Sequence, residues 1–298
     1  MMPCPVCGET DASPVQLDLL LPLVRCRRCR LVHGGVSAQT WKAAEHYEDY
    51  YNPSNTTFDT LTESRYRDIL SYMERIHHRG RLLDVGCGAG HLLVTADAHG
   101  WSAVGQEVSA SGLQWLRSLK TKSGAAFELI ADDLGDANLP PASFAAITLI
   151  EVIEHLPAPV SILERCRALL EPGGVLFLTT PNFDCLSRRL LGIQWRQFNP
   201  DHLCLFDVVS LRTALERAGF RPVRLLTKNI DVPEIMTKLR SRKPGVPLER
   251  DFNLLPATCD LRQRIESRQW LRAVKSAINA ALRVSRTGDT LEAFAVKR

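Results

Sequence analysis

Hydrophobic residues in the second half of the chain gather in short runs, separated by segments whose apolar positions recur every three or four residues. The short runs are typical of strands buried on both faces of a sheet, and the wider spacing is typical of amphipathic helices. The two patterns alternate from residue 81 onwards, which predicts a parallel sheet covered by helices on both sides. The predicted strands are 82–85, 102–106, 126–130, 144–150, 175–180, 222–227 and 291–296.

Capping and helix-breaking residues mark where the helices between these strands begin and end. Pro159 suits a first-turn position, so a helix is expected over 160–170. The Glu-Pro-Gly-Gly sequence at 171–174 is expected to stop that helix and to form a tight turn. Asp207 can cap a further helix, which Gly219 would end.

The chain divides into three segments by composition. Residues 1–35 hold two Cys-x-x-Cys pairs and are predicted to be a small zinc ribbon, and 80–298 is the α/β domain with a polar, partly helical insertion at 229–288. The segment 36–79 between them is aromatic and acidic. Its tyrosine-rich stretch at 47–51 is interpreted either as a lid over a binding site or as ordinary aromatic packing.

Bulk composition narrows the classes of function. The 298 residues are 45% hydrophobic with a net charge of +4, which is ordinary for a globular protein and gives little support to nucleic-acid binding. The N-terminus lacks the apolar core of a signal peptide, so we expect a cytoplasmic protein with no membrane partner. Nine cysteines then suit reduced thiols and metal ligands better than disulfides. A monomer and a homodimer both remain open.

The two N-terminal cysteine pairs have the spacing of a structural zinc site. Cys4 and Cys7 form one pair, and Cys26 and Cys29 form the other. Two such turns complete a closed, tetrahedral site with no position left for a substrate. Zinc would therefore act structurally, by folding a segment too small to fold alone.

A glycine loop follows the first predicted strand. Its glycines, Gly86, Gly88 and Gly90, have the spacing Gly-x-Gly-x-Gly, whereas a dinucleotide site needs Gly-x-Gly-x-x-Gly to seat a pyrophosphate. Asp84 precedes the loop, where it could meet a cationic ligand. Cys87 lies inside the loop, where its small size suits close packing. S-adenosylmethionine carries an ammonium and a sulfonium group and no pyrophosphate, so it suits this loop.

Acidic residues end the next two predicted strands. Glu107 follows the second strand, where a carboxylate can accept hydrogen bonds from both ribose hydroxyls. Asp132 and Asp133 follow the third strand, where a side chain and the next backbone amide, that of Leu134, can reach an adenine ring. The alternative is that Asp84 and these acids are solvated strand ends, and their common register argues against it.

Four short motifs lie at strand ends and turns. They are LDVGCGAG at 83–90, EVIEHL at 151–156, LEPGG at 170–174 and TPN at 180–182. Together they resemble the class I S-adenosylmethionine-dependent methyltransferases, in the branch that contains the ubiquinone-biosynthesis O-methyltransferases. The resemblance covers about half the chain, and it departs from the family at Ala145, where an aspartate is usual. It implies a Rossmann-like, doubly wound sheet of seven strands whose last strand is antiparallel.

The same resemblance suggests residues for the chemistry. In the O-methyltransferases a Glu-x-x-Glu-His stretch is tied to catalysis and sometimes to a divalent metal, and Glu151, Glu154 and His155 match it. It places Glu151 beside the cofactor and gives catalytic roles to Glu154 and His155, with Mg²⁺ as the metal if one is present. The alternative is that His155 caps a turn and that Glu154 packs locally.

A second histidine follows the fifth predicted strand. His202 lies in a loop that could fold over the acceptor, and a hydroxyl acceptor gains from a base of near-neutral pKa. Trp195, Arg196 and Phe198 are expected to form part of an acceptor pocket. The alternative is a packed loop in which His202 hydrogen-bonds the backbone.

These features predict methyl transfer to a small molecule, to a hydroxyl oxygen of a metabolite, sugar or secondary metabolite. An RNA methyltransferase is the second hypothesis, in which Arg25, Arg27, Arg28 and Arg30 of the ribbon and residues 228–250 would bind phosphate. A non-enzymatic zinc-ribbon interaction protein is the third. The glycine spacing argues against a fourth, an NAD-dependent oxidoreductase.

Overall fold

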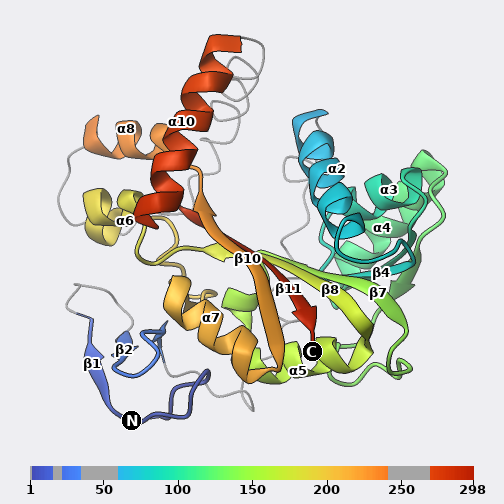
Figure 1. Ribbon diagram of the computed structural model, residues 1–298, viewed down its shortest axis with the longest axis horizontal. Helices are drawn as coiled ribbons and strands as arrows, with labels where there is room; N and C mark the ends of the chain where they lie inside the picture. The colour runs from blue at the N-terminus through green and yellow to red at the C-terminus, as the bar shows by residue number, and fades with distance from the viewer. Residues whose placement is uncertain (1, 16–21, 35–59, 241–268) are drawn as a thin grey trace.

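The computed structural model describes residues 2–15, 22–34, 60–240 and 269–298, so the predicted lid at 47–51 lies outside the described residues. The centre is a seven-stranded sheet in the order β10-β11-β8-β7-β4-β5-β6 (Figure 1). Its strands are β4 (Arg81–Val85), β5 (Ser102–Gln106), β6 (Glu128–Ile130), β7 (Phe144–Ile150), β8 (Leu170–Pro181), β10 (Phe220–Lys228) and β11 (Thr290–Lys297). Strand β11 is antiparallel to both neighbours, which confirms the predicted fold.

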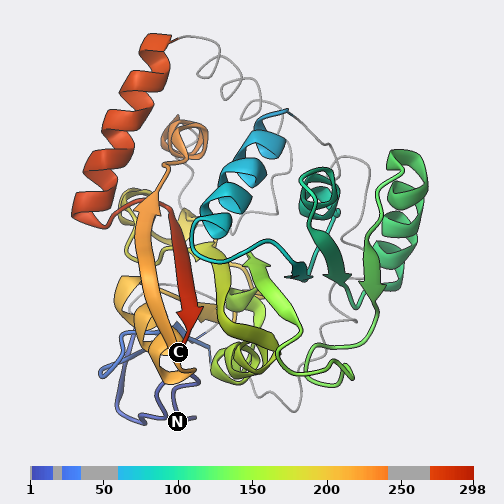
Figure 2. The same cartoon turned by 45° about the vertical axis from the view of Figure 1, so that its right-hand side comes forward.

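Helices cover both faces of this sheet, as the alternating pattern predicts. One face carries α2 (Thr60–Glu74), α3 (His91–Ala98) and α4 (Ala110–Ser123), and the other carries α5 (Pro159–Leu169) and α7 (Val208–Arg217) (Figure 2). Side chains alternate between two buried clusters along each strand. Leu82 packs in the cluster with α2 and α3, and Leu83 packs in the cluster with α5 and α7. Every residue of β4 after Arg81 is therefore buried.

The predicted caps are confirmed. Helix α5 begins at Pro159, and Gly219, with a φ of 81°, follows α7. The side chain of Asp207 accepts hydrogen bonds from the backbone N–H groups of Val209 and Ser210 at the start of α7. Each of these residues acts through its own backbone or its nearest neighbours, which is why the sequence alone locates it.

Three local predictions differ from the structure. Residues 171–174 are not a tight turn but the bulged first part of β8, where pairing with β7 shifts between Phe144–Leu170 and Ala146–Val175. Strand β6 begins two residues later than predicted. Helix α4 is not among the predicted elements. The Ser109 side chain caps its start, and Gly124, with a φ of 71°, ends it.

The N-terminal ribbon is joined to the main body by a second sheet. Its strands β1 (Ala12–Pro14), β2 (Val24–Cys26) and β3 (Val32–His33) are followed in the sheet by β9 (Cys204–Leu205), which comes from the segment after β8. The remaining elements are η2 (Ile153–His155), α6 (Leu186–Leu191), η3 (Gly192–Gln194), α8 (Val232–Arg240) and α10 (Gln269–Ser285). Among the described residues, no helix combines the length and apolar character needed to cross a bilayer.

Candidate active site

The glycine loop joins β4 to α3 at the C-terminal edge of the sheet. Gly86, Gly88 and Gly90 all have positive φ values, of 61°, 54° and 76°. A Cβ atom on Gly90 would lie 2.5 Å from Leu116 Cδ2, and one on Gly86 would lie 2.9 Å from Val152 Cγ2. The nearest neighbour of a Cβ on Gly88 would be the Gly86 carbonyl oxygen, 3.9 Å away. Packing thus requires the outer glycines, while the described residues leave room at Gly88 for a ligand to approach the backbone.

Cys87 supports this loop from beneath. Its side chain is buried against Gly105 of β5, where an added Cβ would lie 2.8 Å from the Cys87 sulfur. Burial raises the pKa of the Cys87 thiol well above its usual value, so the residue is not poised as a nucleophile. The interpretation of Cys87 as a small packing residue fits this geometry.

Gln106, at the end of β5, connects the first and third loops of the site. Its Oε1 accepts a hydrogen bond from the Gly86 N–H at 3.1 Å, and its Nε2 donates to the Asp132 carbonyl at 3.0 Å. The residue is not among the predicted site residues. The signal in the sequence that could have found it is a polar side chain at the last position of the predicted strand 102–106, directly before Glu107.

Asp84 is held beneath the glycine loop. It is only 4% exposed, and the hydroxyl of Thr148 on β7 donates a 2.5 Å hydrogen bond to its Oδ1. Burial raises the pKa of Asp84 to about 7, and the negative charge of Glu107 acts in the same direction. A cationic group bound nearby would favour the ionised form of this carboxyl.

The other predicted acids follow β5, which pairs with β4, and β6, the edge strand beyond β5. Glu107 is buried, and its Oε1 accepts a 2.9 Å hydrogen bond from the Ser109 N–H. Asp132 and Asp133 are exposed, and Asp133 Oδ1 accepts a hydrogen bond from the Gly135 N–H. Leu134 is buried in the core. The three loops after β4, β5 and β6 therefore bring the predicted cofactor residues to one edge of the sheet.

Glu151 begins the loop after β7 in a strained conformation. Its φ is 55°, which is unusual for a residue other than glycine, and its N–H donates to the Thr179 carbonyl at 3.0 Å. The side chain reaches solvent, but desolvation by the surrounding protein raises the pKa of Glu151. Nearby cations such as Arg65 lower this pKa and offset part of the effect. Such strain often marks functional positions.

Glu154, three residues later, is buried instead. It is 1% exposed, and the Thr180 hydroxyl donates a 2.9 Å hydrogen bond to its Oε2. Burial raises the pKa of Glu154 well above its usual value, and the charge of Glu151 adds to the effect. The carboxyl is therefore biased towards the neutral form.

His155 and His202 come together from two different loops. Their rings pack edge to face, with centroids 4.8 Å apart. His155 Nδ1 lies 2.9 Å from the Asp201 carbonyl oxygen, and His202 Nδ1 lies 3.0 Å from the Gln197 carbonyl oxygen. A carbonyl can only accept, so each Nδ1 carries a proton and each neutral ring keeps Nε2 as its basic nitrogen.

The ligand atoms of Glu154, His155 and His202 lie within 4.8 Å of one another. The predicted metal set contained Glu151 instead, and Glu151 is not part of this group of described residues. Two imidazole nitrogens and one carboxylate suit a transition metal better than Mg²⁺, which prefers oxygen ligands. The chemistry of this donor set therefore does not fit the predicted magnesium.

The predicted wall of the acceptor pocket is only partly exposed. Trp195 is 2% exposed and packs with Phe183 and with Val32 of the ribbon, so it belongs to the core. Arg196 is half exposed, with its Nη2 3.2 Å from Asp231 Oδ2. Aromatic character alone does not distinguish a pocket wall from a core cluster, which explains the error for Trp195.

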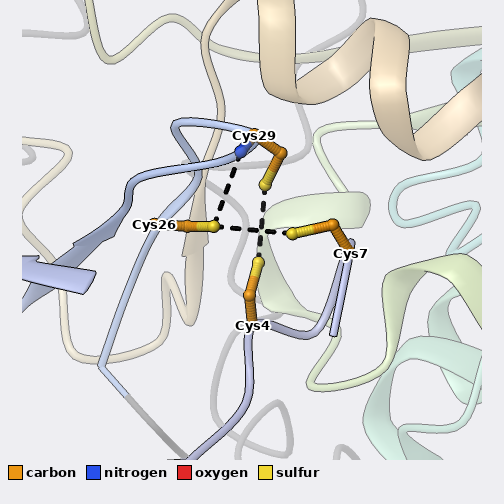
Figure 3. Close-up of side chains that lie close together, drawn as sticks. All are labelled: Cys4, Cys7, Cys26 and Cys29. Carbon is orange, nitrogen blue, oxygen red and sulfur yellow. Dashed lines mark hydrogen bonds between the residues drawn. The ribbon is translucent and has the colours of Figure 1, made fainter. Parts of the chain in front are cut away.

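The four N-terminal cysteines converge on one point (Figure 3). Cys4 Sγ lies 3.5 Å from Cys29 Sγ, Cys7 Sγ lies 3.5 Å from Cys26 Sγ, and all four sulfurs lie within 4.8 Å of one another. Four sulfurs bound tetrahedrally to zinc at about 2.3 Å would be roughly 3.8 Å apart. All four side chains are buried, and none forms a disulfide. The donor set therefore fits a closed zinc site.

Comparisons with known proteins agree with this fold. A family model described as a methyltransferase domain matches residues 58–225, more than half of the chain. The ubiquinone biosynthesis O-methyltransferase of Paraburkholderia phymatum is 38% identical over 186 residues, which cover 59% of this chain and 77% of that protein. Its counterpart from Pectobacterium carotovorum is 33% identical over 103 residues, so this chain spans only 43% of that relative's length.

Solved structures show the same architecture. A SAM-dependent methyltransferase from Archaeoglobus fulgidus superposes with a TM-score of 0.53 at 17% identity, covering 85% of this chain and 98% of that chain. A putative sarcosine dimethylglycine methyltransferase from Galdieria sulphuraria gives a TM-score of 0.53 at 13% identity, covering 80% and 85%. At these identities the likeness concerns the fold alone.

Proposed function

The chain belongs to the family of methyltransferase domains and is an S-adenosylmethionine-dependent enzyme, and we propose that it methylates a hydroxyl oxygen of a small molecule. The observation that carries this proposal is the histidine pair at the edge of the sheet. Both Nδ1 atoms point to carbonyl oxygens, so both rings keep Nε2 as the basic nitrogen. A hydroxyl acceptor needs a base of this kind, because it loses its proton as the methyl group arrives.

Residues at the ends of β4, β5 and β6 would hold the cofactor, which supplies an activated methyl group when bound. The backbone at Gly88 would meet its amino acid part, and Asp84 would balance the charge of the ammonium group. Glu107 accepts hydrogen bonds from the ribose hydroxyls, since its carboxylate is already oriented by the Ser109 N–H. Asp132, Asp133 and the backbone of Leu134 border the adenine ring.

The acceptor lies on the other side of the methyl group, near β7 and the segment 195–206. Methyl transfer is an in-line displacement at an activated sulfonium, so the protein contributes mainly alignment and proton removal. One of the two Nε2 atoms, of His155 or His202, takes the hydroxyl proton. Glu154 packs against Thr180 and holds the turn that carries His155.

Oxygen as the acceptor atom is supported by the relatives, which are named as O-methyltransferases of ubiquinone biosynthesis. The RNA alternative is weakened by the ribbon itself. Arg25 and Arg30, two of its four arginines, form ion pairs with Asp184 and Asp207 of the main body. Because these two arginines are already paired with carboxylates, the ribbon has fewer cationic groups with which to bind phosphate.

Zinc has a structural role in this proposal. The four buried cysteines offer a closed set of thiolates, and the described part of the ribbon around them contributes three short strands. A segment of this size needs the binding energy of a metal to fold.

Calorimetric titration with S-adenosylhomocysteine tests the cofactor site. We expect micromolar binding to the wild type and at least tenfold weaker binding to Glu107→Ala, about 1.4 kcal/mol. The matched control is Glu128→Ala, which removes an exposed carboxylate at the start of the edge strand β6, where it pairs with Arg81 of β4. Equal affinity of all three proteins would refute the assigned site.

Release of S-adenosylhomocysteine then identifies the acceptor class. Phenols, catechols and sugars are incubated with S-adenosylmethionine and the zinc-loaded protein, beside amines and RNA of matched concentration. Turnover with hydroxyl compounds supports the proposal, and turnover with RNA or amines alone overturns it.

A further inference from the structure

The segment between β8 and α7 forms a long excursion whose two ends meet. Asn182 and Phe206 form an isolated bridge, and the Phe183 N–H donates to the Phe206 carbonyl at 2.7 Å. The excursion carries His202, and Asp201 within it accepts the hydrogen bond from His155 Nδ1. The position of the histidine pair therefore depends on how this segment is held.

The zinc ribbon pairs directly with the last part of this excursion. Strand β3 is antiparallel to β9, with Val32 opposite Leu205 and His33 opposite Cys204. Cys204 in turn donates from its sulfur to the Leu156 carbonyl at 3.5 Å, immediately after the 3₁₀ turn that carries His155. A continuous set of contacts thus leads from the ribbon to both histidines.

Two arginines of the ribbon join the ends of the excursion. Arg25 Nη2 lies 3.0 Å and Arg30 Nε 2.8 Å from Asp207 Oδ2, and both guanidinium groups also reach Asp184. Asp207 lies at the end of the excursion and is only 2% exposed, while Asp184 lies near its beginning. A buried carboxylate shared by two arginines is held more strongly than an ordinary surface pair.

The arginines owe their placement to the cysteine site. Arg25 directly precedes Cys26 and Arg30 directly follows Cys29, so the same turn that supplies two sulfurs directs both guanidinium groups towards the main body. The cysteines also belong to the same buried cluster as Phe206 and Leu211. The ribbon therefore packs as part of the domain that contains the site.

We propose that the zinc ribbon is a positioning element of the active site, in which Arg25 and Arg30 hold the segment 182–207 so that His155 and His202 meet. The catalytic meaning of this arrangement rests on the proposed function. Arg25 and Arg30 are positioning residues, since they act through Asp184, Asp207 and β9. Loss of the contact frees the excursion and separates the histidine rings, while the cofactor loops after β4 and β5 keep their structure.

The test compares the double variant Arg25→Met/Arg30→Met with Arg27→Met, both zinc-loaded. Arg27 is the matched control, because it lies on the same turn but pairs with Asp11 inside the ribbon. Amide hydrogen exchange is measured for 201–206 and, as a reference, for β4 and β7. Resonances of the His155 and His202 rings are followed by NMR. Zinc content and S-adenosylhomocysteine affinity are recorded for each protein.

We expect the double variant to keep its zinc and its cofactor affinity, to exchange the 201–206 amides at least tenfold faster, and to shift both histidine resonances. Arg27→Met should behave as the wild type. Wild-type exchange and unchanged histidine resonances in the double variant would overturn the proposal.

Two further measurements test the role of the ribbon if the double variant does not fold. Arg25→Lys/Arg30→Lys retains both charges and should show intermediate exchange at 201–206. Removal of zinc from the wild type by a chelator should accelerate exchange at 201–206 but leave β4 protected. Equal protection of 201–206 with and without zinc contradicts the proposal. These readouts need no acceptor, so they stand even if the histidines prove not to be catalytic.

Discussion

His155 and His202 meet edge to face with their ring centroids 4.8 Å apart, although they follow different strands of the sheet. Each ring donates from Nδ1 to a backbone carbonyl of the same excursion, at Asp201 and Gln197. Main-chain contacts at both Nδ1 atoms therefore orient the two rings and set the position of each Nε2. This makes the pair sensitive to single substitutions that remove one nitrogen at a time.

Replacing either histidine with asparagine should separate the roles of the two rings. Asparagine keeps a donor near the position of Nδ1, and so keeps the carbonyl contact, but it has no counterpart of Nε2. We expect the variant that removes the general base to lose about 10²- to 10⁴-fold in kcat, and the other to lose less. Steady-state kinetics with the identified acceptor measure the difference.

The control for this pair is His99→Asn. His99 Nδ1 also contacts a backbone carbonyl, that of Thr95 at 2.7 Å, but it lies at the end of α3. Its kcat should equal that of the wild type, and all three variants should bind S-adenosylhomocysteine normally. Unchanged kcat in both His155→Asn and His202→Asn would remove the histidines from the mechanism.

The fold and the cofactor loop could be predicted because their signals are local. The strand 144–150 is one apolar run, and the spacing of the glycines is enough to predict the loop at Gly86. Helix α4 lacks such a local signal. Polar and basic residues interrupt its apolar positions, and no glycine or proline directly precedes its cap at Ser109. Its existence depends on packing beneath the glycine loop, where Leu116 contacts Gly90.

The acceptor side could not be predicted in the same way. Strands β3 and β9 pair although about 170 residues of sequence separate them, and no local pattern in the sequence specifies such a partner. The family motif joins Glu151 with Glu154 and His155, whereas among the described residues the structure groups Glu154 and His155 with His202. The positive φ of Glu151 instead leaves its side chain exposed while Glu154 is buried.

Gln106→Leu should loosen the cofactor site and destabilise the fold. The substitution leaves the Gly86 N–H and the Asp132 carbonyl without their partner, and because both bonds are only partly buried we expect a cost of about 0.5–1.5 kcal/mol for each. We expect a lower free energy of unfolding in urea and weaker S-adenosylhomocysteine binding. Gln114→Leu, at an exposed position of α4, should change neither. Equal stability of the two variants would show that Gln106 does not join the loops.

Alanine at two glycines of similar conformation should separate steric clash from backbone strain. Gly90 and Gly124 have φ values of 76° and 71°, so alanine is strained at both, by about 1–2 kcal/mol. Only at Gly90 would the new Cβ also collide with Leu116, 2.5 Å away, while none of the described residues has an atom within 4 Å at Gly124. We expect Gly90→Ala to be the more destabilising by about 1–3 kcal/mol in urea unfolding. Equal losses would mean that α4 shifts without cost.

Comparison of Asp84→Asn with the wild type at different pH values should show how much the buried carboxylate lowers the stability of the fold. Burial raises the pKa of Asp84 to about 7 in the folded protein, whereas an unfolded aspartate has a pKa of about 3.9. The folded state thus holds the proton more tightly, and the stability that protonation provides is lost as pH rises from about 4 through 7. Asparagine can still accept the Thr148 hydrogen bond but carries no charge.

Without cofactor, Asp84→Asn should therefore melt at a higher temperature than the wild type at pH 8, and the difference should be clearly smaller at pH 5, since it vanishes only below about pH 4. The variant should also bind S-adenosylhomocysteine more weakly at pH 8, since no carboxylate remains to balance the ammonium group. Asp68→Asn, at an exposed position on α2, serves as the control and should melt with the wild type at both pH values. If the melting difference were the same at pH 5 and pH 8, the ionised Asp84 side chain would not be the cause of the lower stability of the wild type.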